Sequence, residues 1–224
     1  MTAQMTGLPS AGMATGFPAV ARERIRTLVT SRFERSIRAP KIFFDANADA
    51  VSATTLAMAR RFRSGGRLLV FGEGANATDA QHVSVEFVHP VIVGKRALPA
   101  IALTNDVASL TAPARGGRPG HGFDAMLRTL GRSTDIALGL CDDRKSSPVT
   151  EALDFARDMR MLTIAVASHP DNGSSLARFD HLFSIRGEDP LASQEVSETL
   201  YHVLWELVHI FLDHMPDDSS EMEG

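Results

Sequence analysis

The stretch RLLVFGEGANATDAQHVSVEF, residues 67–87, decides the fold class of this chain. It begins with a short unbroken apolar run, turns at a glycine-containing segment, and continues into a predicted helix over about 77–88. An apolar run without polar alternation is typical of a strand that is covered on both faces of a parallel sheet. The stretch therefore predicts a strand, a turn and a helix, the opening unit of an α/β fold.

Four more apolar runs of similar length follow, and helical segments separate them. The predicted strands are 67–72, 97–103, 135–141, 161–167 and 181–185. The predicted helices beyond 77–88 are 106–112, 121–131, 147–160 and 191–213, with a short turn near 173–178. This alternation predicts a three-layer α-β-α sandwich around a five-stranded parallel sheet, of the flavodoxin-like α/β class.

The segment before the first strand is predicted to be helical, because apolar residues recur there at three- and four-residue steps. Pro40 is expected to divide it into two helices, and Gly65 and Gly66 to end the second. We expect a flexible tail at 1–17, a single domain at 18–214 whose first part (18–64) holds the N-terminal helices, and an acidic flexible tail at 215–224.

The composition excludes several classes of function. A net charge of −4 and a pI near 6.1, without a cluster of basic residues, argue against a nucleic-acid partner. No uncharged apolar run approaches the roughly 18 residues that a membrane span needs. The start lacks the basic and apolar regions of a secretory signal, and a single cysteine, Cys141, excludes an internal disulfide. We therefore expect a cytoplasmic protein.

The loops that follow the strands are the expected ligand sites. The glycines of the first loop, Gly72 and Gly74, partly fit a dinucleotide fingerprint, but no carboxylate stands about 20 residues later, so a tight turn explains them as well. Asp106 could accept from ligand hydroxyls or cap the next helix. Ser146 opens a helix, where it could bind phosphate or act only as a cap.

Two helices carry polar side chains that need an explanation. His82 and Glu86 are four residues apart, so they project from one helix face as a solvated pair, a metal site or a proton-transfer pair. On the last helix, polar residues including Gln194 and His202 interrupt an otherwise apolar cylinder. A helix that is apolar on most faces is buried or packs against another subunit, so we expect a homo-oligomer.

These segments together resemble the SIS (sugar isomerase) domain family, and within it the phosphoheptose isomerases that act on D-sedoheptulose 7-phosphate. The best-matching segments are DAQHVSVEF (79–87), ALPAIALTND (97–106), HGFD (121–124), the region 135–166 and QEVSETLYH (194–202). The resemblance implies that Glu86 is the base acting on the C2 proton and His202 the acid, through an enediol. It implies a zinc ion held by His82, Glu86, Gln194 and His202. It also implies a homotetramer, or a dimer, with shared sites.

A sugar or sugar phosphate is the implied ligand, and the residues expected to bind it are Gly74, Asn76, Asp106, Ser146 and Gln194. The first loop departs from the family's GNGGS-like pattern, because Glu73 replaces an asparagine, Ala75 a glycine and Asn76 a serine. The family's STSGNS phosphate loop is CDDRKS (141–146) here, which keeps only its last serine and brings in two carboxylates that repel phosphate.

Three functions follow from these matches and departures. The first is aldose–ketose isomerisation of a sugar phosphate such as sedoheptulose 7-phosphate. The second is a noncatalytic SIS protein that binds a sugar derivative or serves in assembly or regulation. The third is a zinc-binding SIS protein with an altered ligand. The four retained polar residues (His82, Glu86, Gln194 and His202) favour the first and third, whereas the changed phosphate loop favours the second and third.

Overall fold

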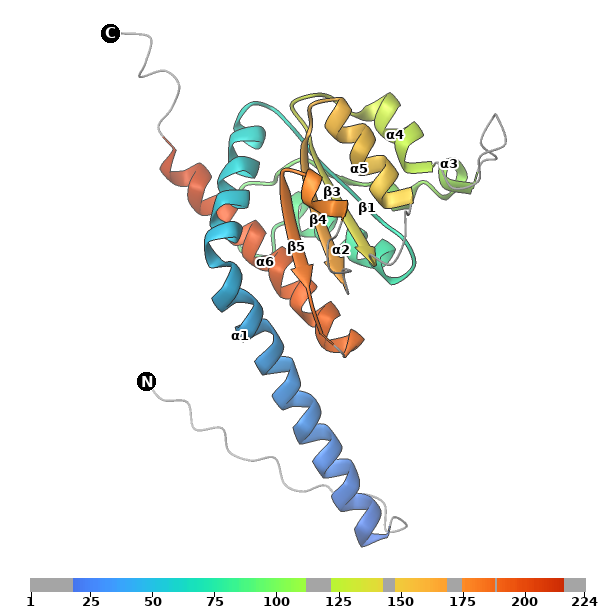
Figure 1. Cartoon of the computed structure of the whole chain (residues 1–224). Helices are drawn as coiled ribbons and strands as arrows, with labels where there is room; N and C mark the ends of the chain where they lie inside the picture. The colour runs from blue at the N-terminus through green and yellow to red at the C-terminus, as the bar shows by residue number, and fades with distance from the viewer. Residues whose placement is uncertain (1–17, 112–121, 143–147, 169–174, 188, 216–224) are drawn as a thin grey trace. The chain divides into compact units, whose positions relative to one another are not determined.

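A five-stranded parallel sheet lies at the centre of the computed structural model, which describes residues 18–111, 122–142, 148–168, 175–187 and 189–215. The strands are β1 (Leu68–Gly72), β2 (Ala100–Ala102), β3 (Ile136–Asp142), β4 (Leu162–Ser168) and β5 (His181–Ile185). Their order across the sheet is β2-β1-β3-β4-β5, and every pairing is parallel. Figure 1 labels four of these strands, β1, β3, β4 and β5, side by side. The predicted α/β class and the five parallel strands are confirmed.

Helices connect the strands, as the sequence predicts. They are α1 (Ala19–Arg63), α2 (Ala75–Val88), α3 (Val107–Thr111), α4 (Gly122–Leu130), α5 (Pro148–Asp158) and α6 (Pro190–His214), with short 3₁₀ helices η1 (Leu103–Asn105) and η2 (Ser175–Arg178). None of the helices in the described ranges combines the length and the apolar character that crossing a membrane requires.

The predicted break at Pro40 is wrong, because α1 runs through this residue as one helix. Proline removes its own N–H from the hydrogen-bond ladder and its ring crowds the carbonyl four residues earlier, a cost of about 3 kcal/mol, but its fixed φ is a helical value. The helix can therefore continue past Pro40, at a local cost in stability. Its predicted end is confirmed, since α1 stops at Arg63 and Gly65 follows with a φ of 79°, a left-handed conformation that suits glycine.

The chain divides into two compact units next to this proline, one ending at Arg38 and the other beginning at Ala39. In the first unit, α1 exposes an apolar face. Its members are Ile25, Leu28, Val29, Phe33 and Ile37, with exposed fractions of 45–66%. In the second unit, the remainder of α1 buries Val51, Met58 and Phe62 in the core beside the sheet.

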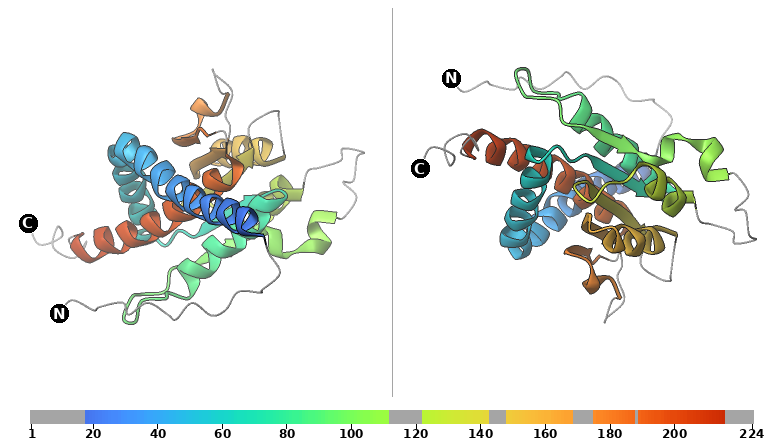
Figure 2. Two further views of the ribbon diagram at one scale, coloured as in Figure 1. Left: turned by 90° about the horizontal axis from the view of Figure 1, so that it is seen from below. Right: turned by 90° about the horizontal axis from the view of Figure 1, so that it is seen from above.

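The side chains of β1 alternate between two cores and so define the layers. Leu68 and Val70 pack into a core that also takes residues of α1, α2 and α6. Leu69 and Phe71 pack into a second core with residues of α4 and α5. The sheet is thus covered by helices on both faces, as Figure 2 shows from two directions. This explains why its strands are apolar runs without polar alternation.

The strand order reverses direction between β1 and β3, because β2 lies on one side of β1 and β3 on the other. At such a point the loops that leave the carboxyl ends of the two strands diverge and open a crevice, where ligands of α/β sheets bind. The segment 72–74 follows β1 there, and α2 starts directly after it. The fold therefore places the first loop and the start of α2 at the expected ligand site.

Candidate active site

Two helices from distant parts of the sequence, α2 and α6, carry the candidate active site. Ala80, Val83 and Phe87 of α2 share the first core with Val196 and Leu200 of α6, so the two helices pack together through their apolar faces. The start of α6 is capped. The Asp189 side chain accepts from the backbone N–H groups of the residues two and three positions later, at 3.0 and 3.3 Å.

Glu86 lies at the centre of a cluster in which its Oε1 approaches two imidazoles. The distance from Glu86 Oε1 to His82 Nε2 is 3.3 Å, and to His202 Nε2 it is 3.9 Å. The rings of His82 and His202 meet edge to face with centroids 5.3 Å apart. The Glu86 side chain is only 12% exposed, whereas those of His82 and His202 are 35% and 53% exposed.

This arrangement suits proton transfer and metal binding. A carboxylate and an imidazole in mutual reach can serve as base and acid for one substrate that enters from the exposed side. One ligand atom from each of His82, Glu86 and His202 lies within 4.8 Å of the other two. Two imidazole nitrogens and a carboxylate oxygen are also a donor set that zinc accepts. The sequence-predicted residues His82, Glu86 and His202 are therefore brought together.

Gln194 of α6 also contacts α2, but its partner there is Asp79. Its Nε2 donates to Oδ1 of Asp79 at 3.3 Å. Asp79 is buried, 4% exposed, and burial raises the pKa of its carboxyl; the nearby Glu198 also raises this pKa, while the Gln194 hydrogen bond lowers it. Because Asp79 precedes His82 by about one helical turn, Gln194 lies beside the cluster. Burial also raises the pKa of the neighbouring Tyr201 hydroxyl.

A pocket of about 310 Å³ lies at the carboxyl ends of the strands, near the start of α2. The described residues that line it are Gly72, Glu73, Gly74, Ala77, Thr104, Leu110, Gly122, Phe123 and Pro148. Glu73 is the single charged residue among them. Its partial burial raises the pKa of its carboxyl. This volume lies at the lower end of the range found for pockets that bind small ligands.

The remaining predicted binding residues have mixed positions. Gly74 lines the pocket with a φ of 58°. Asn76, the second residue of α2, packs so closely on Gly72 that a Cβ there would lie 2.7 Å from the Asn76 carbonyl oxygen. Asp106 is exposed and accepts from the N–H and hydroxyl of Ser109, which lowers its pKa; it thus caps α3, one of its two expected roles. Ser146 lies outside the described residues.

Two residues of the site were not singled out from the sequence. In the sequence, Glu73 stands out only as a departure from a family pattern, and Asp79 only as the first residue of the matching segment 79–87. The spacing of Asp79 and His82, one turn apart on one helix, was the signal that both face α6. Asp79 lies just beyond the first turn of α2 and is buried.

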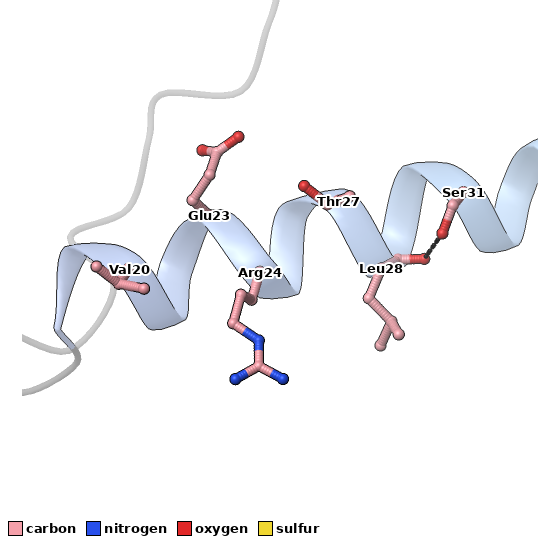
Figure 3. Close-up of a pocket in the computed structure, with 6 residues that line it drawn as sticks. All are labelled: Val20, Glu23, Arg24, Thr27, Leu28 and Ser31. Carbon is pink, nitrogen blue, oxygen red and sulfur yellow. Dashed lines mark hydrogen bonds between the residues drawn. The ribbon is translucent and has the colours of Figure 1, made fainter.

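A second hollow lies along the first unit of the chain and does not form a comparable site. It is lined by Val20, Glu23, Arg24, Thr27, Leu28 and Ser31, all from α1. Figure 3 shows that the Glu23 carboxylate and the Arg24 guanidinium point to opposite sides of this helix. Its marked hydrogen bond joins the Ser31 hydroxyl to the Leu28 carbonyl, within the helix. These side chains do not converge on a common ligand.

Comparison with known proteins identifies the family. The SIS domain model matches residues 33–168, more than half of the chain. A phosphoheptose isomerase of Thermodesulfovibrio yellowstonii is 33% identical over 199 residues, covering 89% of this chain and 98% of the relative. A phosphoheptose isomerase of Chlorobium phaeobacteroides is 39% identical over 169 residues, covering 70% of this chain and 72% of the relative.

Solved structures agree with these relatives. The phosphoheptose isomerase of Neisseria gonorrhoeae superposes with a TM-score of 0.71 at 28% identity, covering 82% of this chain and 98% of that one. The enzyme of Francisella tularensis gives a TM-score of 0.70 at 26% identity, with 86% and 98% covered. The chain belongs to the SIS domain family, in the group of the phosphoheptose isomerases.

Proposed function

We propose that the protein is an aldose–ketose isomerase that acts on a sugar phosphate such as sedoheptulose 7-phosphate or on a related sugar. The observation that carries this proposal is the approach of His82 and His202 to one carboxylate oxygen of Glu86, at 3.3 and 3.9 Å. The relatives named phosphoheptose isomerase support the same reaction class.

In the proposed reaction, Glu86 takes a proton from the carbon beside the carbonyl and returns it to the neighbouring carbon. His202 gives a proton to the carbonyl oxygen while the adjacent hydroxyl loses one, so that an enediol lies between ketose and aldose. The low exposure of Glu86, 12% of its side chain, means that a substrate displaces little water when it reaches this carboxylate. The greater exposure of His202 leaves its ring accessible to a substrate oxygen.

The residues of the cluster also fit a zinc ion, which we propose is held by His82, Glu86 and His202. Their ligand atoms already lie within 4.8 Å of one another, so modest side-chain movements would bring them to zinc. Gln194 is the proposed fourth ligand through its amide oxygen, since its nitrogen is held by Asp79. A bound zinc ion would supply Lewis-acid polarisation of the substrate carbonyl.

We also propose a homo-oligomer, a tetramer or a dimer, in the cytoplasm. The exposed apolar face of the first unit, which includes Leu28 and Phe33, supports a subunit contact, because a surface of this kind is normally covered. The lone cysteine, Cys141, which is buried, supports a compartment where thiols stay reduced.

The experiment is an isomerase assay on purified protein. D-sedoheptulose 7-phosphate is incubated with the protein, and the aldose product is detected by chromatography and NMR. We expect conversion in both directions and incorporation of solvent deuterium at the carbons that exchange the proton. A folded preparation that converts neither D-sedoheptulose 7-phosphate nor D-sedoheptulose, with and without added zinc, would contradict the proposal.

A second candidate is the same metal and acid–base site with an altered ligand. The observation that favours it is Glu73, a carboxylate in the pocket at the carboxyl ends of the strands. A noncatalytic sugar-binding role is a third candidate, and turnover in the assay above would reject it. The cluster of His82, Glu86 and His202 argues against this role, because binding alone does not require an acid–base set in this arrangement.

A further inference from the structure

Among the described residues that line the pocket, one side chain is a carboxylate and none is cationic. Thr104 is the other polar side chain that lines it, and its Oγ1 already donates to the carbonyl of Ala77 at 3.3 Å. The rest of this wall is glycine, proline or apolar. Glu73 therefore dominates the charge that a ligand meets among the described lining residues.

The backbone holds Glu73 at this place. Its carbonyl accepts from the N–H of Asn76 at 3.1 Å, in the turn that starts α2. On one side, Gly72 has no space for a Cβ, which would lie 2.7 Å from the Asn76 carbonyl oxygen. On the other side, Gly74 has a φ of 58°, which residues with a side chain rarely adopt. The turn is thus fixed on both sides of Glu73.

The environment of Glu73 favours a hydrogen-bond donor as its partner. Glu73 is exposed at the rim of the pocket, and its partial burial there raises the pKa of its carboxyl. A ligand hydroxyl or ammonium group in the pocket could donate a hydrogen bond to this carboxylate. A phosphate would instead bring further negative charge and more acceptor oxygens to a site that already holds one anion.

This inference rests on the proposed isomerase function and narrows its substrate. We infer that Glu73 is a specificity-determining residue: it accepts a hydrogen bond from a hydroxyl or ammonium group of the sugar and discriminates against a phosphate in this pocket. The pocket reaches Ala77, and His82 follows about 8 Å further along α2 at 1.5 Å per residue, so the pocket and the cluster are built on the same helix.

The test measures binding of two probes, D-sedoheptulose and D-sedoheptulose 7-phosphate, by isothermal titration calorimetry. Wild type, Glu73→Gln, Glu73→Asp and the control Asp158→Asn are compared. Asp158 is a suitable control because its side chain is 75% exposed near the end of α5 and does not line the pocket. Circular dichroism melting curves check that each variant is folded.

We expect wild type to bind D-sedoheptulose at least as tightly as its 7-phosphate. Glu73→Gln keeps the size of the side chain and removes its charge. The Kd for the 7-phosphate should therefore fall, relative to the Kd for D-sedoheptulose, by about tenfold or more. Glu73→Asp and Asp158→Asn should leave the preference on the side of the unphosphorylated sugar.

The outcomes separate this inference from the isomerase proposal. Preferred binding and turnover of the 7-phosphate by wild type, with the Kd ratio unchanged in Glu73→Gln, would overturn the inference and leave the isomerase intact. Preferred, Glu73-dependent binding of D-sedoheptulose without interconversion would support the inference and reject the isomerase. Failure of both sugars to bind folded wild type would overturn the inference as well.

Discussion

The Nε2 atom of His202 lies 3.9 Å from Oε1 of Glu86, and Nε2 of His82 lies 3.3 Å from the same oxygen. One carboxylate oxygen is therefore approached by imidazoles from two helices, one directly after β1 and the other after the last strand. This approach depends on the packing of α2 against α6 in the first core. The chemistry of the site is thus a consequence of tertiary packing.

Replacing Glu86 by glutamine should remove the base while keeping the side-chain shape. An amide cannot accept the transferred proton, so kcat should fall by about 10²–10⁴-fold. The measurement is the rate of aldose formation and of deuterium incorporation, with whichever of D-sedoheptulose 7-phosphate and D-sedoheptulose the wild type converts. Glu206→Gln, an exposed position on the same helix as His202, is the matched control. Undiminished turnover by Glu86→Gln would reject Glu86 as the base.

Replacing His82 by alanine should lower the zinc content of the purified protein. The imidazole supplies one of the three clustered ligand atoms, and its loss leaves two from this set. Zinc per chain is measured by inductively coupled plasma mass spectrometry after dialysis against zinc. His214→Ala, at the exposed end of α6, controls for nonspecific binding to histidine. Equal zinc in wild type and His82→Ala, or none in either, would argue against the proposed metal site.

Much of the fold was predictable because each strand is a compact apolar run and each helix follows a recognisable turn. The bounds of β5 agree with the predicted 181–185, and α6 begins and ends within one residue of the predicted 191–213. Two predictions are wrong in detail: the strand expected at 97–103 is only Ala100–Ala102, and Pro40 does not break α1, since local propensity does not report how well a helix tolerates a proline. Such tolerance depends on the whole helix and its packing.

The site was predictable only where spacing along one helix carried the information. His82 and Glu86 share a face by their separation, whereas their approach to His202 required both packing and the resemblance to a family. Glu73 had no such signal, because a carboxylate beside a turn is ordinarily solvated, and it lies exposed at the rim of the pocket. The spacing of Asp79 and His82 indicates a shared helix face, but the burial of Asp79, which is 4% exposed, could not be read from that spacing.

His181 should make the protein less stable in mildly acidic solution. Burial lowers the pKa of this imidazole below its ordinary value of 6.5, while Asp180 partly opposes the shift. The unfolded chain therefore binds more protons than the folded chain as the pH falls below about 6.5, so the free energy of unfolding decreases. The effect is absent well above pH 6.5, where His181 is neutral in both states.

The corresponding measurement compares melting temperatures of wild type and His181→Gln between pH 5 and pH 8. Glutamine cannot be protonated, so the difference between the two proteins should change with pH, by about 2 °C in favour of the variant at the acid end. His214→Gln, which replaces an exposed histidine, should melt in parallel with wild type. A pH-independent difference between wild type and His181→Gln would show that burial of this ring does not contribute to acid sensitivity.

Replacing Gly72 by alanine should disturb the pocket and the start of α2 together. The added Cβ would lie 2.7 Å from the carbonyl oxygen of Asn76 and 2.8 Å from its Cβ, so backbone must shift to admit it. We expect a loss of about 1–3 kcal/mol in the free energy of unfolding and weaker sugar binding.

Gly94→Ala is an informative control, because Gly94 has a φ of 89° but no atom within 4 Å of an added Cβ. It should reduce stability through backbone strain alone and leave sugar binding unchanged. Urea unfolding and calorimetric titration of both variants measure the two effects, and equal sugar affinity in Gly72→Ala and wild type would show that the ligand does not depend on this turn.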